Sequence, residues 1–272
     1  MKKLVVPVIF FLFLPLVLGS YISISVTISS AQDSLHVKLE QKGDEAAYRI
    51  RVVPFFSQYF DCNGNIESEK LYPGDSLDGN FKITPKFKLN GMYPFVAKII
   101  YHDANMYPFS IISYHPIEYG KTGQPEITGY MSDTIIEAGG QKNILVKIKN
   151  DGTEERKVKV KIYLPNELGT NEKEKDVLLQ AGEEKKIDFT VISKSALPRS
   201  SYNVLVTLEY DKGMHYTTFV TGMVRIIEKK ESISLLGSLV ALFIALLLLF
   251  IYLKWSIKRE KNESVSDNSH LK

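Results

Sequence analysis

The feature that most constrains the fold of this chain is an internal repeat. Landmarks of its first half recur about 108 residues later, in the same order and with the same residue types. The matched pairs are Leu71 with Leu179, Gly74 with Gly182, Phe81 with Phe189, Tyr93 with Tyr202, Tyr101 with Tyr210, and Asp103 with Asp211. So many matches at one spacing predict two copies of one structural unit.

Apolar residues alternate with polar ones inside each copy, which predicts half-buried strands. The clearest run of the second copy is Tyr202, Val204, Val206, Leu208 and Tyr210. Turn-forming residues separate short strands of this kind, a spacing typical of β-sandwiches. We therefore expect an all-β fold of two tandem immunoglobulin-like β-sandwiches, over residues 32–123 and 124–228. Tyr93 and Tyr202, each at the start of a strand, are expected to form tyrosine corners that stabilise the fold.

The N-terminus has the pattern of a signal peptide. Two lysines precede an uncharged apolar run from Leu4 to Leu18. Cleavage is expected after Gly19 or after Ala31, and the second point is preferred because a polar chain follows it, which gives a signal peptide of residues 1–31. An uncleaved N-terminal anchor is the alternative.

A second apolar run, Ile233 to Leu253, carries no charge and is followed by Trp255 and several basic residues. About 20 apolar residues span a bilayer core of ~30 Å as a helix. We expect a single transmembrane α-helix at 233–253, with the N-terminal ectodomain outside the cell membrane and a cytoplasmic tail at 254–272.

Composition narrows the possible functions. The net charge of +3 is too small to indicate nucleic-acid binding. Cys62 is the only cysteine, so no intrachain disulfide is possible; as a nucleophile it would need a base such as His102 or His115, and no basic cluster flanks it. No cofactor or metal site is predicted, because the calcium-loop-like start at Asp61–Asn65 is better explained as a turn. We expect no enzymatic activity.

The most unusual segment of the first copy runs from Tyr101 to Ser110, where aromatic and polar residues meet at an expected hairpin tip. Residues of these types at a loop tip bind sugars or peptides. The candidate partner-binding residues are Tyr101, His102, Asp103, Asn105, Tyr107 and Phe109. The alternative is a divergent hairpin whose aromatic side chains pack inward.

The second copy resembles the CARDB-type immunoglobulin-like domains of bacteria and archaea. The resemblance covers Ile135 to Val224 and rests on Ala138-Gly139-Gly140, Val146 to Gly152, Leu179 to Glu183, and the strand that begins at Tyr202. It implies a seven-stranded sandwich that serves as a spacer or adhesion module on a cell-surface protein.

These expectations combine into a membrane-anchored cell-envelope protein whose non-enzymatic ectodomain binds or scaffolds a protein or glycan outside the cell. The alternative is an accessory subunit of an envelope export or assembly complex. In that case the transmembrane helix would contact a multi-span partner through Gly237 and Ser238.

Overall fold

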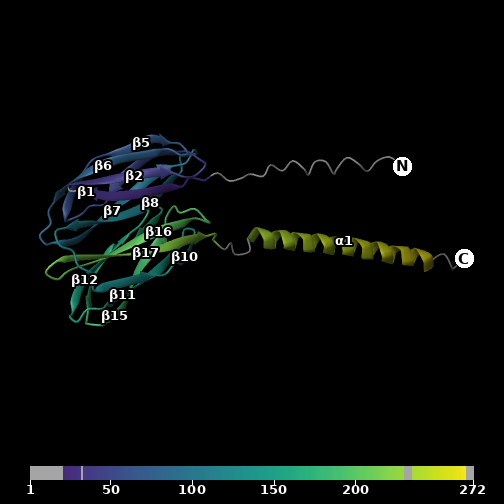
Figure 1. The fold of residues 1–272 in the computed structure, drawn as a ribbon. Helices are drawn as coiled ribbons and strands as arrows, with labels where there is room; N and C mark the ends of the chain where they lie inside the picture. The colour runs from purple at the N-terminus through teal and green to yellow at the C-terminus, as the bar shows by residue number, and fades with distance from the viewer. Residues whose placement is uncertain (1–20, 32, 230–234, 268–272) are drawn as a thin grey trace, which may run out of the picture. The chain divides into compact units, whose positions relative to one another are not determined.

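A computed structural model describes residues 21–31, 33–229 and 235–267 of the chain (Figure 1). The chain divides into two units, one ending at Glu228 and the other beginning at Lys229. Residues 1–20, which include the apolar run of the signal peptide predicted at residues 1–31, lie outside the described part.

The first copy of the repeat is a sandwich of two four-stranded sheets. One sheet has the order β1 (Ile24–Ala31), β2 (Ser34–Gln41), β6 (Ser76–Pro85) and β4 (Phe60–Asn63). The facing sheet has the order β5 (Ile66–Leu71), β3 (Ala47–Pro54), β7 (Gly91–His102) and β8 (Pro108–Tyr119).

The second copy repeats this strand order. Its first sheet contains β9 (Ile127–Met131), β11 (Gln141–Asn150), β15 (Glu184–Ser193) and β13 (Leu168–Thr170). The facing sheet contains β14 (Glu174–Leu179), β12 (Arg156–Tyr163), β16 (Ser201–Asp211) and β17 (His215–Ile227), and β10 (Thr134–Glu137) pairs in parallel with β17. The predicted duplicated β-sandwich is confirmed, although each copy has more strands than the seven that the CARDB resemblance implies.

Each sandwich has its own core, and both predicted tyrosine corners are present. The Tyr93 hydroxyl donates to the Leu89 carbonyl at 2.7 Å, and the Tyr202 hydroxyl accepts from the Leu197 N–H at 3.4 Å. Both rings are buried. The two hydroxyls therefore tie the start of a central strand to the segment before it, in both copies.

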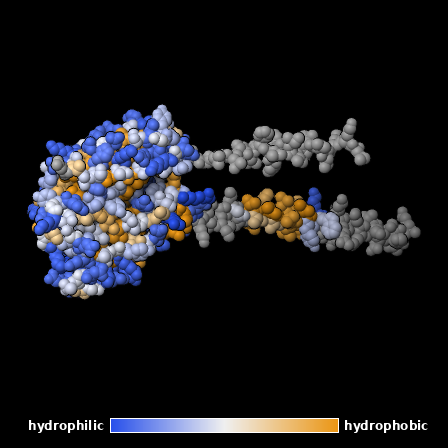
Figure 2. Space-filling view, in the orientation of Figure 1, coloured by the Kyte–Doolittle hydropathy of each residue, from blue (hydrophilic) through white to orange (hydrophobic). Residues whose placement is uncertain are grey.

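The two sandwiches pack against each other through their facing sheets, as Figure 1 shows for β7 and β8 beside β16 and β17. A third apolar cluster fills this junction, formed by Val96, Ile112, Tyr163 and Leu205 with Phe55 and Phe219 against them. In Figure 2 hydrophilic side chains dominate the outer layers, and apolar patches gather in the band between them.

The prediction of half-buried strands is wrong for β16. Leu205, Thr207 and Glu209, on the face expected to meet solvent, are buried together with the core-facing residues. The cause is the first sandwich, which covers this outer face.

One glycine allows the backbones of the two copies to approach closely. Gly91 begins β7 and forms the only strand pairing that links the two facing sheets within the described residues, with His215. Its φ is +145°, and a Cβ at this position would lie 2.0 Å from the His215 carbonyl oxygen. Only glycine fits here without displacing backbone.

The N-terminal strand bears on the predicted cleavage points. β1 pairs with β2 along its full length, from Ile24 opposite Gln41 to Ala31 opposite Ser34. Cleavage after Ala31 would remove β1 from the sheet, whereas cleavage after Gly19 would leave the first sandwich intact. The first sandwich therefore begins before position 32, where its boundary was expected.

The second unit contains α1 (Leu235–Asp267). The predicted transmembrane helix at 233–253 is wrong: within the described residues, no helix is both long enough and apolar enough to cross a membrane.

Candidate partner-binding groove

The hairpin that was predicted to bind a partner lies between β7 and β8, and its aromatic rings pack within the protein. Tyr101 is buried and stacks on Phe109, with ring centroids 5.6 Å apart. Phe109 also meets the Tyr107 ring edge-on, and the Tyr107 hydroxyl donates to the Ser195 carbonyl of the second sandwich. The inward-packing alternative therefore describes these aromatic side chains.

The polar residues of the hairpin mostly shape its turn. The Asp103 carboxylate accepts from the backbone N–H groups of Asn105 (2.9 Å) and Tyr107 (2.8 Å), while Met106 has a φ of +62°. His102 Nδ1 is buried without a hydrogen-bond partner in the described part of the chain. Of the six predicted residues, Asn105 is exposed at the tip; Tyr101, Asp103 and Phe109 hold the hairpin together, and Tyr107 links it to the second sandwich.

Next to this hairpin, a buried carboxylate fastens the two sandwiches together. Glu167, 2% exposed, accepts from the Ser110 N–H at 2.6 Å and from the Ser110 hydroxyl at 2.7 Å. Ser110 Oγ in turn accepts from the Asn166 N–H at 2.7 Å, and the Lys98 ammonium donates to the Asn166 side chain at 2.6 Å. The loop 164–167, which follows β12, is thus bonded to β7 and β8 of the first sandwich at this side of the junction.

His215 occupies the other side of the junction. Its ring stacks on Tyr93 with centroids 4.3 Å apart, and its Nδ1 lies 2.7 Å from the Asp211 carboxylate. Thr217 Oγ1 lies 3.4 Å from His215 Nε2, so the three residues resemble the order of a hydrolase triad. The Thr217 hydroxyl is buried and donates to the Met92 carbonyl at 2.8 Å. It is therefore not available as a nucleophile, and the cluster joins the sandwiches.

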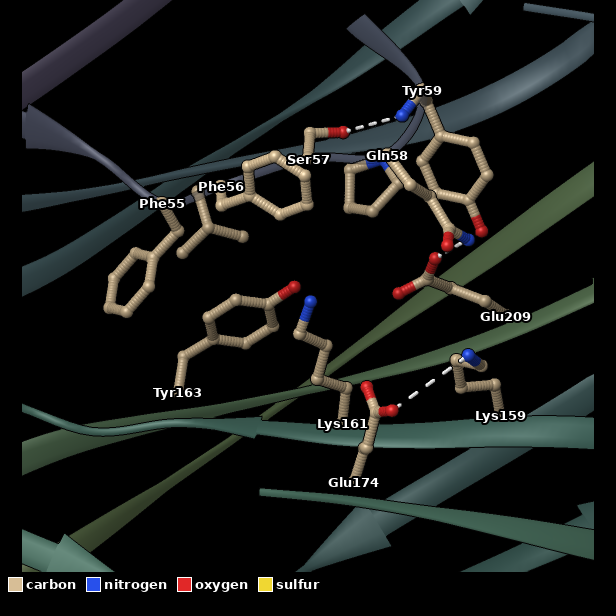
Figure 3. A pocket seen from close by; sticks show the side chains of 12 residues that line it. Phe55, Phe56, Ser57, Gln58, Tyr59, Lys159, Lys161, Tyr163, Glu174 and Glu209 are labelled. Carbon is tan, nitrogen blue, oxygen red and sulfur yellow. Dashed lines mark hydrogen bonds and ion pairs between the residues drawn. The ribbon is translucent and has the colours of Figure 1, made fainter.

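A groove opens between these two attachments. Its wall on the first sandwich is the loop 55–59 after β3, and its floor on the second is the outward face of β12 with Glu174 of β14 and Glu209 of β16. The hollow that these residues line has a volume of about 240 Å³. Figure 3 shows Lys161 and Tyr163 reaching from β12 toward Phe56 and Ser57.

A hydrogen bond across the groove joins loop 55–59 of the first sandwich to β16 of the second. The Tyr59 hydroxyl donates to Glu209 Oε2 at 2.8 Å (Figure 3), and the Thr207 hydroxyl donates to Glu209 Oε1 at 2.7 Å. Burial and the Glu209 charge raise the pKa of Tyr59 above its usual value, so its phenol stays protonated and donates at neutral pH. Glu209 itself is 6% exposed and receives two hydroxyl donors.

The groove continues past Tyr59 in both directions. Gln58 and Tyr59 line two further hollows, one toward Arg156 and Lys157 and another toward Lys86 and Lys88. Lys157, Lys159 and Lys161 share one face of β12 because alternate residues of a strand point the same way. Beside them Phe56 is 83% exposed.

Sequence reasoning missed this groove, though part of its signal was present. In the sequence, lysines alternate with apolar residues from Lys157 to Ile162, a pattern typical of a strand with one charged face. The Pro54-Phe55-Phe56 segment of the first copy has no counterpart in the CARDB-like pattern of the second. What the sequence did not show is that the two sandwiches pack face to face, which brings these segments together.

Cys62 does not meet the requirements of a nucleophile. Burial raises the pKa of its thiol to about 11, which disfavours the reactive thiolate. Neither His102 nor His115 forms a hydrogen bond or ion pair with it in the described structure; His115 Nε2 is instead 3.1 Å from Ser30 Oγ. Among the described residues, no three or more histidine, cysteine, aspartate or glutamate side chains are placed to hold a metal ion.

Comparisons with known proteins reveal no close relative. No family model matches the chain, and no curated protein matches it in sequence. Solved structures similar to parts of it include the ASH/PapD-like domain of human CEP192, which is 13% identical with a TM-score of 0.30 and covers 41% of this chain and 94% of that one. Salmonella alpha-2-macroglobulin reacted with methylamine is 8% identical with a TM-score of 0.31, covering 75% of this chain and 16% of that one.

A third structure is a protein of unknown function from Porphyromonas gingivalis W83. It is 10% identical with a TM-score of 0.29, and the match covers 75% of this chain and 98% of that one. Likenesses at this level of identity and TM-score identify neither a family nor an activity.

Proposed function

We propose that this chain is a non-enzymatic binding or scaffolding protein of the cell envelope, and that its partner site is the groove between the sandwiches. The observation that carries the proposal is a hollow of about 240 Å³ beside a phenylalanine that is 83% exposed. A partner that covered Phe56 at the rim of this hollow would gain the free energy of burying its ring, about 2–3 kcal/mol.

The location in the envelope rests on the signal-peptide pattern of the sequence. Adhesion or spacing is the role that the CARDB resemblance implies, and the raised thiol pKa of Cys62 together with the buried Thr217 hydroxyl favours binding over catalysis. The groove replaces the β7–β8 hairpin as the candidate site, because the hairpin's aromatic rings are already packed.

A photo-crosslinking experiment tests the proposal. A photoreactive phenylalanine analogue replaces Phe56 in the full chain, expressed in cells of its source, and Leu145 is replaced in the same way as a control. Leu145 is also exposed but lies on β11 in an outer sheet. We expect a discrete adduct from position 56 alone. No adduct, or the same adduct from both positions, would refute the groove as the partner site.

A further inference from the structure

We propose that β1 pairs edge to edge with β1 of a second copy of this chain, so that the first sandwiches of two molecules join through one continuous sheet. The inference is independent of the groove and of what binds there. It rests on the open edge of β1, on the lack of charge and proline along this strand, and on a backbone pattern that is its own complement.

The outer edge of β1 presents backbone groups that have no partner strand. The Ser23 carbonyl accepts from the Lys42 N–H at 2.7 Å, so the Ser23 backbone faces β2. Bonded and non-bonded residue pairs alternate along an antiparallel ladder, and the register of β1 with β2 is unbroken. The residues whose N–H and C=O groups therefore point away from β2 are Ile24, Val26, Ile28 and Ser30. Within the described part of the chain, β1 pairs with no strand other than β2.

The other edge strands are protected against pairing with another molecule. Proteins protect their sheet edges with short strands, charged side chains or prolines. Strands β4, β9, β10 and β13 have five residues or fewer, β5 and β14 carry charged residues, and β8 contains two prolines. β1 has eight residues, of which none is charged and none is proline. Among the edge strands that the structure describes, β1 alone lacks all three protections.

Strand β8 lies beside one end of β1 and leaves the edge of β1 open. His115 Nε2 is 3.1 Å from Ser30 Oγ, which is a contact between side chains. The backbone of β8 pairs with β7 and, in the described structure, forms no ladder with β1. The four outward-facing residues of β1 can therefore pair with a strand of another molecule.

These four residues are symmetric about Thr27, which makes a second β1 a fitting partner. With a twofold axis at Thr27, Ile24 lies opposite Ser30 of the second copy, and Val26 lies opposite Ile28. Each such pair exchanges two hydrogen bonds in an antiparallel ladder, so all four residues are satisfied in both copies. An axis shifted by one residue leaves at least one of the four without a partner inside β1.

The side chains of β1 suit the same register on both faces of the sheet. Val26 and Ile28 pack against the core, so their pairing across the axis extends the apolar layer from one copy to the other. Ser25, Thr27 and Ser29 lie on the outer face, where Thr27 meets its own copy and Ser25 meets Ser29. Opposed hydroxyl side chains form favourable cross-strand pairs, and no like charges meet.

Sedimentation velocity of the full chain over a range of concentrations tests the inference, after intact mass has confirmed that the protein retains β1. We expect a reversible dimer. Thr27→Lys and Thr27→Glu should each weaken the association about fivefold, because like charges then meet at the axis. An equimolar mixture of the two variants should recover the affinity of the unchanged chain, because opposite charges meet instead.

The control is Thr153→Lys, which adds the same charge in an exposed turn of the second sandwich and should leave the association unchanged. Thr27 is exposed as well, so its variants are expected to fold. Melting temperatures of all variants check this.

Engineered cysteines test the register in a Cys62→Ala background. Thr27→Cys is expected to form a disulfide between two copies under mild oxidation, because opposed Cβ atoms of a non-bonded pair lie about 4.5 Å apart. Ser25→Cys alone is the control and should not crosslink, since Ser29 of the second copy lies opposite. Mixing Ser25→Cys with Ser29→Cys should give the crosslink again.

Several results would overturn the inference. The chain could stay monomeric at the highest concentration at which it is soluble, or its mature form could begin after Ala31 and lack the strand. A dimer that Thr27→Lys weakens no more than Thr153→Lys forms through another surface. A mixture of the two charged variants that does not recover the affinity, or a crosslink from Ser25→Cys alone, excludes the axis at Thr27. None of these results bears on the groove, which the crosslink from position 56 tests separately.

Discussion

Two corresponding loops of the repeat have opposite roles in this protein. Loop 55–59 follows β3 and loop 164–167 follows β12, the matching strand of the second copy, and both face the other sandwich. Loop 164–167 inserts Glu167 into the junction, where Ser110 satisfies the carboxylate with two hydrogen bonds. Loop 55–59 attaches through the Tyr59 hydroxyl and the Phe55 ring, buries no charged side chain in the junction, and leaves Phe56 exposed over a groove. A duplicated fold can thus close a junction with one copy of a loop and form a binding site with the other.

The largest expected effect on stability comes from removing the Glu167 carboxylate from loop 164–167. Glu167→Ala removes the acceptor of the buried Ser110 N–H, and leaving such a donor without a partner costs about 2–3 kcal/mol in the free energy of unfolding. Urea denaturation measures the loss. Glu137→Ala, which truncates an exposed glutamate of β10, is the control and should change stability by less than about 0.5 kcal/mol. A loss no larger than that of the control would show that loop 164–167 does not hold the junction.

A smaller loss of stability is expected from a change in loop 55–59. Tyr59→Phe keeps the ring against His215 and removes one of the two hydroxyl donors of Glu209, which should lower the free energy of unfolding by about 1–1.5 kcal/mol. Thermal denaturation would detect it beside Tyr130→Phe, a change at an exposed ring. If Tyr59→Phe costs as much as Glu167→Ala, the two loops fasten the junction equally and the contrast between them fails.

The Cys62 thiol reports on loop 55–59 without any change in the sequence. Cys62 lines a hollow together with Phe55 and Phe56, and burial raises its thiol pKa to about 11. Alkylation by iodoacetamide should therefore be slow at pH 8 in the folded protein and rise about tenfold per pH unit until the pKa is approached. A fast reaction at pH 8, matching that of the chain in urea, would mean that loop 55–59 moves aside and exposes the thiol.

The same thiol affects stability in a defined direction. Because its pKa is raised above the ordinary value of 9.0, the folded state favours the protonated form. The resulting contribution to stability is complete below about pH 9 and is lost as the pH rises through about 11. Urea denaturation between these values, compared with Cys62→Ala, isolates it.

The sequence predicted the parts of the fold whose signals are local or repeated. The shared spacing of the two copies predicted the duplication, and Tyr93 and Tyr202 at strand starts predicted the corners. The alternation within β16 correctly identified the core face from Tyr202 to Tyr210. These features depend on strand period and turn chemistry, which are visible in a single segment.

The junction between the copies left no comparable signal. Leu205, Thr207 and Glu209 form a mixed surface that is suitable for water, and only the contacts with the first sandwich bury them. The hairpin from Tyr101 to Phe109 has the residue types of a partner-binding loop, but in the structure Tyr101 and Phe109 stack on each other and Tyr107 bonds to Ser195. The groove requires both surfaces at once, so no single segment predicts it.

Strands β7 and β16 bury residues of their outer faces between the two sandwiches, and this has a consequence for how the chain folds. Either sandwich alone would leave the apolar cluster of Val96, Ile112, Tyr163 and Leu205 in contact with water. Each copy therefore gains stability from the other, and unfolding should be a single cooperative transition in which neither half persists as a populated intermediate. Duplication has here produced one thermodynamic unit from two sandwiches.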